Sequence, residues 1–158
     1  MDNYEFTNQW FEKTAKPLWS QIINQSKPKK ILEIGSYEGA SICYLIDTLS
    51  LHHDAFEINA IDTWDGGIEH KEMKINMKLV EERFKKNTSL AIKKSKKSIE
   101  LITHKAKSIN ALSKLITSKK SGYFDFIYID GSHMASDVLS DAISVSYTHL
   151  RAHETDRH

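Results

Sequence analysis

The stretch ILEIGSYEGAS, residues 31–41, places a bend with two glycines after the carboxylate Glu33, with a second carboxylate, Glu38, inside the bend. Gly35 and Gly39 allow the backbone to turn tightly and allow a ligand to approach the main chain. Their spacing, E-x-G-x-x-x-G, differs from the G-x-G-x-x-G of a dinucleotide site, and no Lys-Ser/Thr follows as in a P-loop. Because two carboxylates would repel a phosphate, the turn favours a cationic or zwitterionic ligand.

Asp62 is a second candidate binding residue, because it ends the next strand-like segment after the turn. A carboxylate at such a position can accept hydrogen bonds from both hydroxyls of a ribose. The sequence offers glycines for close approach and one acid for a ribose, but no cradle for phosphates. This combination describes a site for adenosine without phosphates. These residues therefore predict S-adenosylmethionine as the cofactor. A Rossmann-type NAD(P) protein is the alternative, which the glycine spacing disfavours.

The segments that must position these residues alternate between strand-like and helix-like patterns. Short apolar and β-branched runs predict strands in KKILEIGS, FEINAIDTW, IELITH and FDFIYID. Helical spacing of apolar residues predicts helices in GASICYLIDTLS, KEMKINMKLVEERFKKN, SINALSKLI and SDVLSDAI. This alternation implies right-handed crossovers and a parallel sheet. We therefore expect a doubly wound, Rossmann-like α/β domain with its ligands beyond the carboxyl ends of the strands.

Three segments are expected along the chain. Residues 1–27 have the apolar spacing of two lead-in helices, and Pro17 suits the first turn of the second helix. Residues 28–144 hold the strands and helices of the cofactor-binding core. Residues 145–158 have almost no apolar periodicity and resemble a translated adapter sequence, which is left out of fold reasoning. We therefore expect a core that is truncated after its fourth strand and the helix that follows.

The composition fits one soluble domain, with 158 residues, of which 40% are hydrophobic and 27% charged. No apolar run approaches the roughly 18 residues of a membrane span, and the first ten residues lack the basic and apolar regions of a secretion signal. We expect a cytoplasmic protein without a membrane partner. The oligomeric state cannot be deduced from the sequence.

A lysine-rich stretch leaves a second class of function open. From Lys93 to Lys120 there are nine lysines and one acid, Glu100. Such a stretch would suit a noncatalytic interaction module that binds nucleic acid. However, the whole chain contains only three arginines, and arginine makes the commonest specific contact with bases. The sequence therefore favours a solvated basic face over a nucleic-acid site.

Four separated motifs resemble the class I S-adenosylmethionine-dependent methyltransferases. They are ILEIGSYEGAS, IDTWDGGIEH, EERFKKN and FDFIYIDGSHMASDVLSDA. The resemblance is to the branch whose fourth strand ends in IDGSH, which is similar to some antibiotic-tailoring and sugar O-methyltransferases. It covers nearly all of residues 4–143 and implies methylation of a hydroxyl on a small-molecule acceptor.

The resemblance also assigns cofactor contacts. It implies that the glycine-containing turn contacts the methionine end of the cofactor, that Asp62 contacts the ribose, and that residues 106–108 lie near the adenine. The last contact is the least supported, because HKAKS stands where the family usually has glycine or an acid. The cofactor-binding candidates are Glu33, Gly35, Ser36, Gly39, Asp62, Trp64 and Ser108.

The stretch YIDGSH carries the catalytic candidates, Asp130 and His133. In related metal-dependent methyltransferases an acid at the position of Asp130 helps to bind Mg²⁺, which would lower the pKa of an attacking hydroxyl. Alternatively, His133 is the general base, because imidazole titrates near neutral pH. In a third interpretation His133 only caps the following helix. Asp130 is thus the one candidate metal ligand.

Overall fold

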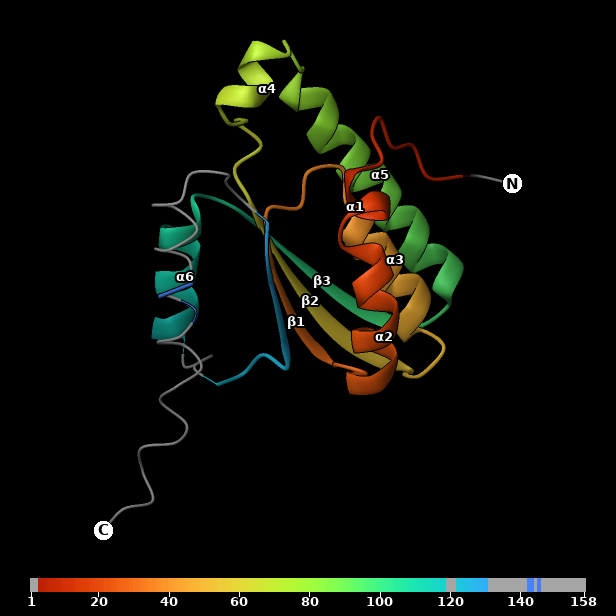
Figure 1. Ribbon diagram of the computed structural model, residues 1–158. Coiled ribbons are helices and arrows are strands. Elements are labelled where there is room, and N and C mark those ends of the chain that lie inside the picture. The colour runs from red at the N-terminus through yellow and green to blue at the C-terminus, as the bar shows by residue number, and fades with distance from the viewer. Residues whose placement is uncertain (1–2, 119–121, 131–141, 144, 146–158) are drawn as a thin grey trace.

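Strands and helices alternate along the chain from β1 onward (Figure 1). The computed structural model describes residues 3–118, 122–130, 142–143 and 145. The elements are α1 (Trp10–Lys13), α2 (Lys16–Ser26), β1 (Lys30–Ile34), α3 (Ala40–Leu49), β2 (Ala55–Asp62), α4 (Ile68–Glu72), α5 (Met77–Ser95), β3 (Ser98–Lys105), α6 (Ser108–Thr117) and β4 (Phe126–Ile129).

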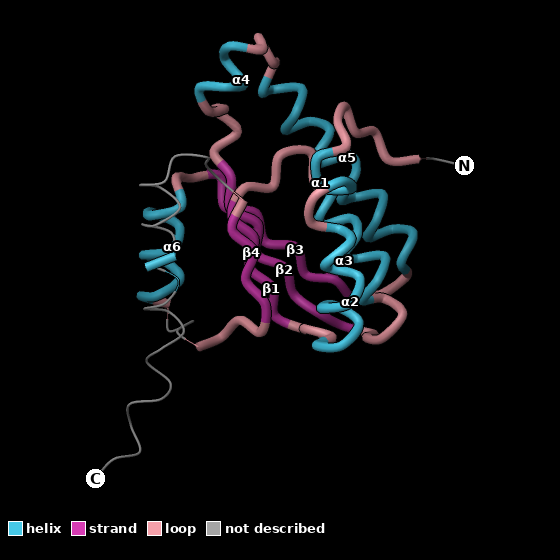
Figure 2. Tube along the Cα trace, in the orientation of Figure 1, coloured by secondary structure: helices cyan, strands magenta, loops and turns pink. Residues whose placement is uncertain are grey.

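The four strands form one parallel sheet in the order β3-β2-β1-β4 (Figure 2). The chain builds outward from β1 through β2 to β3 and then returns to place β4 on the other side of β1. The order therefore reverses between β1 and β4, and ligands of open α/β sheets bind at such a switch point. The predicted doubly wound α/β fold is confirmed.

Two apolar clusters hold helices against opposite faces of the sheet. Successive side chains of a strand point to opposite faces, so Ile31 joins the cluster beneath α2, α3 and α5 while Leu32 joins the cluster beneath α6. Figure 1 shows α6 on one side of the sheet and the other labelled helices on the opposite side or beyond its edge. Because β1 and β2 are covered on both faces, all but their end residues are buried, including the polar Glu33, Glu57 and Asn59.

The helix predicted over residues 71–87 is two helices in the structure. α4 ends at Glu72, and Lys74 adopts a left-handed backbone with φ of 55°. Asn76 then caps α5, because its side-chain oxygen accepts hydrogen bonds from the backbone N–H groups of the two residues that follow Met77. The apolar spacing continues across the break, which explains why periodicity alone did not reveal it.

The predicted helix SDVLSDAI, residues 136–143, lies outside the described residues except for residues 142–143. The predicted tail of residues 145–158 lies outside them except for Val145. Its interpretation as an adapter sequence stays a prediction, and so does the division of the chain into three segments.

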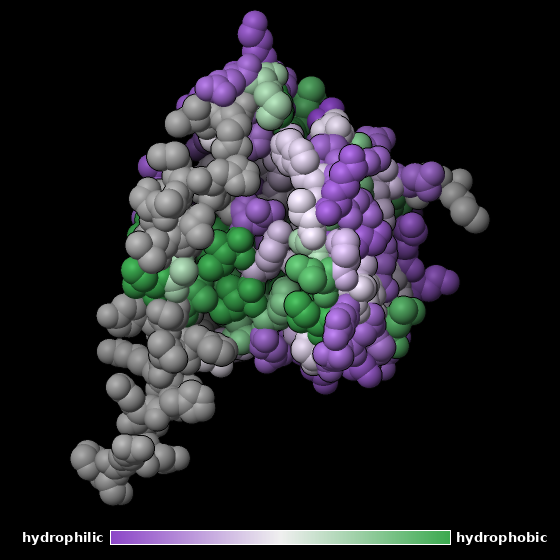
Figure 3. Space-filling model, viewed as in Figure 1, coloured by the Kyte–Doolittle hydropathy of each residue, from purple (hydrophilic) through white to green (hydrophobic). Residues whose placement is uncertain are grey.

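Polar and apolar side chains separate on the surface. In the space-filling view, polar side chains cover the outer helices on one side, and apolar side chains gather beside α6, over the region of β4 (Figure 3). No helix in the described part of the chain is both long and apolar enough to cross a membrane.

Candidate functional site

A pocket of about 60 Å³ lies at the carboxyl ends of β1 and β4, at the switch point of the sheet. The glycine turn, residues 35–39, supplies the first four of its residues to the lining, and the start of α3 supplies residues 40–41. Asp130 adds a carboxylate from the end of β4. The remainder comes from the N-terminal strap, defined here as residues 3–13 and including α1. The strap contributes Phe6, Asn8, Trp10 and Phe11.

The two glycines of the turn have different tasks. Gly35 has φ of 89° and lines the pocket, and its N–H donates to the carbonyl of Ile61 at 2.8 Å. Gly39 has φ of 80°, but it lies against α5, where a Cβ atom would be 3.1 Å from Phe84 and from Thr88. Gly35 thus agrees with the expectation of close ligand approach. Gly39 is instead required by the backbone and by the helix packed on it.

Asp62 holds the glycine turn against the end of β2. Its Oδ2 accepts the backbone N–H groups of Ser36 and Tyr37, each at 2.9 Å, and its Oδ1 accepts that of Trp64 at 2.8 Å. A carboxylate offers about four lone-pair positions, so most are already engaged. The position predicted for ribose recognition therefore also shapes the loop, a task that the sequence pattern did not reveal.

Glu33 is fully buried beneath the turn. Its two carboxylate oxygens accept hydrogen bonds from the hydroxyls of Ser36, at 2.7 Å, and Ser41. Burial raises the pKa of Glu33 to about 7, and the nearby charges of Asp130 and Asp62 act in the same direction while the two serines oppose it. Near neutral pH this side chain therefore exists in both protonation states.

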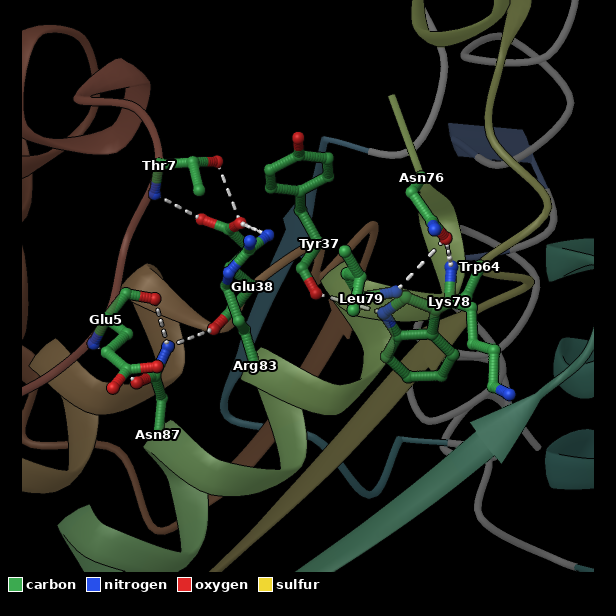
Figure 4. Close-up of polar contacts among 10 residues, drawn as sticks. All are labelled: Glu5, Thr7, Tyr37, Glu38, Trp64, Asn76, Lys78, Leu79, Arg83 and Asn87. Carbon is green, nitrogen blue, oxygen red and sulfur yellow. Dashed lines mark hydrogen bonds and ion pairs between the residues drawn. The ribbon is translucent and has the colours of Figure 1, made fainter. Parts of the chain in front are cut away.

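Glu38 anchors the strap to the glycine turn (Figure 4). Its carboxylate accepts the backbone N–H of Thr7 at 2.7 Å and the hydroxyl of Thr7 at 2.8 Å. Arg83 of α5 pairs with the same carboxylate at 3.0 Å. From the sequence, Glu38 was expected to give the turn a negative charge, but the structure shows that Arg83 compensates this charge within the protein.

Asn87 is a structural residue of the site that sequence reasoning missed. It is 1% exposed, and its amide forms hydrogen bonds with the backbone N–H and C=O of Glu5 in the strap, at 2.8 and 3.0 Å. The same amide donates to the carbonyl of Glu38 at 3.0 Å. Figure 4 shows Asn87 between the strap and the turn. The only sign of this role in the sequence was a polar residue at a position where the apolar periodicity of α5 predicts burial.

Two further cofactor candidates lie apart from the pocket lining. Trp64 is 4% exposed and packs against Phe84 with ring centroids 4.8 Å apart, and its indole N–H donates to the carbonyl of Tyr37 at 2.9 Å. Its side chain therefore packs between α5 and the glycine turn and supports that turn. Ser108 begins α6 after β3, which β2 separates from the glycine turn.

Of the two catalytic candidates, the structure places Asp130. It lines the pocket, its N–H donates to the carbonyl of Ile34 at 2.7 Å, and its carboxylate accepts the hydroxyl of Tyr128 at 3.0 Å. His133 lies outside the described residues. In the described part of the chain, no three histidine, cysteine or acidic side chains come together as metal ligands.

The sequence model of a family described as "Methyltransferase domain" matches residues 32–153. No curated protein matches the chain. Among solved structures, an O-methyltransferase from Bacillus cereus in complex with SAH matches with a TM-score of 0.49 and 18% identity, over 82% of this chain and 47% of that chain. The chain thus spans about half the length of that protein.

Proposed function

Because the chain belongs to the methyltransferase domain family, we propose that it binds S-adenosylmethionine at the glycine turn and transfers the methyl group to a hydroxyl of a small molecule. One observation carries the proposal. The pocket at the switch point of the sheet is lined by the carboxylate of Asp130 and by that of Glu38, with which Arg83 pairs from outside the lining, and, among the described residues, by no lysine or arginine. Such a lining suits a sulfonium cation better than the phosphates of a dinucleotide.

The residues of the site suit both the charged amino-acid end and the adenosine end of S-adenosylmethionine. Gly35 allows the ligand to approach the backbone at the end of β1, where Ala40 and Ser41 begin α3. The N–H groups in the first turn of a helix favour a carboxylate, such as that of a bound amino acid. Buried Glu33 lies behind them as a second source of negative potential. Asp62 retains lone-pair capacity for a ribose hydroxyl.

S-adenosylmethionine supplies an electrophilic methyl group on a positively charged sulfur. Catalysis by the protein then rests mainly on holding the acceptor in line with that methyl group, since near-attack geometry supplies much of the rate. Asp130 faces the pocket, so we assign it the task of accepting a hydrogen bond from the acceptor hydroxyl. The strap covers the same pocket and limits the access of water.

A hard divalent cation needs several oxygen ligands, and among the described residues Asp130 does not join two further acidic, histidine or cysteine side chains that could hold one. Asp130 as a Mg²⁺ ligand and His133 as a general base stay predictions, as does membership of the IDGSH branch.

The proposal is tested by calorimetric titration with S-adenosylhomocysteine, with NADH as the comparison ligand. We expect S-adenosylhomocysteine to bind and NADH not to. Asp62→Ala should weaken binding about ten- to a hundredfold, because it removes a charged acceptor and frees the glycine turn. Asp54→Ala is the matched control, since Asp54 lies at the opposite end of β2 and its side chain is 96% exposed. Unchanged affinity in Asp62→Ala, or preferred binding of NADH, would contradict the proposal.

A further inference from the structure

We infer that the strap side of the pocket recognises a planar aromatic acceptor, with Trp10 and Tyr37 as the residues that determine specificity. This inference rests on the proposed function and adds the chemical class of the substrate. Gly35 and Ser36 supply part of the pocket lining from the glycine turn, and the strap supplies another part. Asp130 belongs to the same lining and is the group assigned to the acceptor hydroxyl.

Aromatic rings dominate the strap side. Phe6, Trp10 and Phe11 come from the strap, and Tyr37 comes from the glycine turn. The rings of Trp10 and Tyr37 lie 5.3 Å apart at 45°, and His70 of α4 stacks on Tyr37 at 5.4 Å and 24°. Offset and tilted ring pairs at these distances are attractive arrangements, so the three rings hold one another in place. Trp10 is nevertheless 49% exposed, which leaves part of its ring surface open to a planar ligand.

The polar side chains of the lining are already engaged within the protein. The hydroxyls of Ser36 and Ser41 donate to Glu33, and the carboxylate of Glu38 receives two hydrogen bonds from Thr7 in addition to the pairing with Arg83.

The Oδ1 of Asn8 likewise accepts the backbone N–H of Trp10 at 3.0 Å. A sugar would bring many hydroxyls into this pocket, and those that find no partner would lose hydrogen bonds to water. A planar ring with one or two hydroxyls brings fewer groups that need hydrogen-bond partners in the pocket. The engaged polar groups therefore favour an aromatic acceptor over a sugar.

The size and opening of the pocket agree with this choice. A volume of about 60 Å³ is smaller than the roughly 150 Å³ of an enclosed cavity that holds benzene. The ligand must therefore extend beyond the pocket, and Trp10 of the lining has 49% of its surface exposed to meet it. A flat ring can lie along Trp10 and Tyr37 with one edge inside the pocket. A puckered sugar ring would need a wider space.

Catechol and methyl glucoside, each titrated into the protein saturated with S-adenosylhomocysteine, test the inference. We expect catechol to bind more tightly than methyl glucoside. Trp10→Ala should weaken catechol binding about tenfold, and Trp10→Phe should restore it to within about threefold, because a ring face returns. Leu51→Ala is the control for loss of an exposed apolar side chain, since Leu51 is 81% exposed and outside the pocket lining.

Tryptophan fluorescence gives an independent measurement. Trp19 and Trp64 are each 4% exposed, so quenching by acrylamide reports mainly on Trp10. Catechol should protect Trp10 from the quencher in the wild type and in Leu51→Ala. Preferred binding of methyl glucoside, binding of neither probe, or catechol binding unchanged in Trp10→Ala would overturn the inference. Binding of S-adenosylhomocysteine in all variants would show that the cofactor site stands independently, whereas its failure in the wild type would count against the proposed function.

Discussion

Three acidic residues around the glycine turn have different surroundings, and these decide what each one does. Glu38 is paired with Arg83 and acts as an anchor for the strap. Asp62 accepts backbone N–H groups and fixes the turn. Glu33 is buried with only serine hydroxyls as hydrogen-bond partners, so its charge is the least compensated. The sequence identified these positions as important, but their partners depend on segments far away in the chain.

Glu33 should make stability depend on pH. Its pKa is raised from 4.5 to about 7 on folding, so the folded protein binds the proton more tightly than the unfolded chain. The contribution of Glu33 to the free energy of unfolding should therefore be highest below pH 4.5 and fall as the pH rises to about 7, by on the order of 3 kcal/mol. Glu33→Gln keeps the shape of the protonated form and should lack this dependence.

Urea denaturation of both proteins between pH 4.5 and pH 8 measures this effect. Other titrating groups cancel in the difference between the two proteins. We expect Glu33→Gln to become progressively more stable than the wild type as the pH rises. A difference that does not change with pH would mean that Glu33 does not titrate in this range.

At the level of elements, periodicity predicted the strands and most helices because burial on a sheet imposes it directly. It did not resolve α4 from α5, since the apolar stripe crosses the break at Lys74 and only the cap at Asn76 marks the new helix. It also identified two lead-in helices without revealing that the strap, which includes the first of them, covers the pocket. That placement depends on two hydrogen bonds to Glu38 and two to Asn87, which leave no periodic signal.

The attachment of the strap can be tested at Asn87. Asn87→Ala removes three hydrogen bonds and leaves the carbonyl of Glu38 without this donor, so the free energy of unfolding should fall by about 2–4 kcal/mol. Urea denaturation measures the change, and limited proteolysis should cut the strap faster in the variant. Asn110→Ala is the control, because Asn110 is an exposed helical asparagine of α6. Equal losses in the two variants would refute the anchoring role.

At the scale of the whole molecule, the lysine-rich surface is interrupted by acidic partners. Lys97 pairs with Asp54, and both Lys85 and Lys105 pair with Glu81. Exposed ion pairs of this kind add little to stability, but they lower the positive potential that a polyanion would meet. The noncatalytic interaction module proposed as an alternative from the sequence depends on that potential.

We predict that the protein binds a 20-base-pair duplex DNA, or RNA of the same length, with a dissociation constant weaker than about 100 μM at 150 mM salt. Fluorescence anisotropy at 50 and 200 mM salt measures this affinity. Salt-sensitive micromolar binding that persists in Asp62→Ala would favour the interaction module over the enzyme.

The attachment of the strap has a consequence for protein synthesis. Glu5 bonds with Asn87, 82 positions later, and Thr7 bonds with Glu38, 31 positions later. The ribosome adds about 5–20 residues per second, so Glu5 waits about 4–16 s for Asn87 to be made, and longer until it leaves the exit tunnel. Asp130, which lines the pocket from the end of β4, is made only after both of these partners. The strap can therefore attach to the glycine turn and to α5 while the sheet is still incomplete, so a nascent chain can form the cover of the pocket before its last wall.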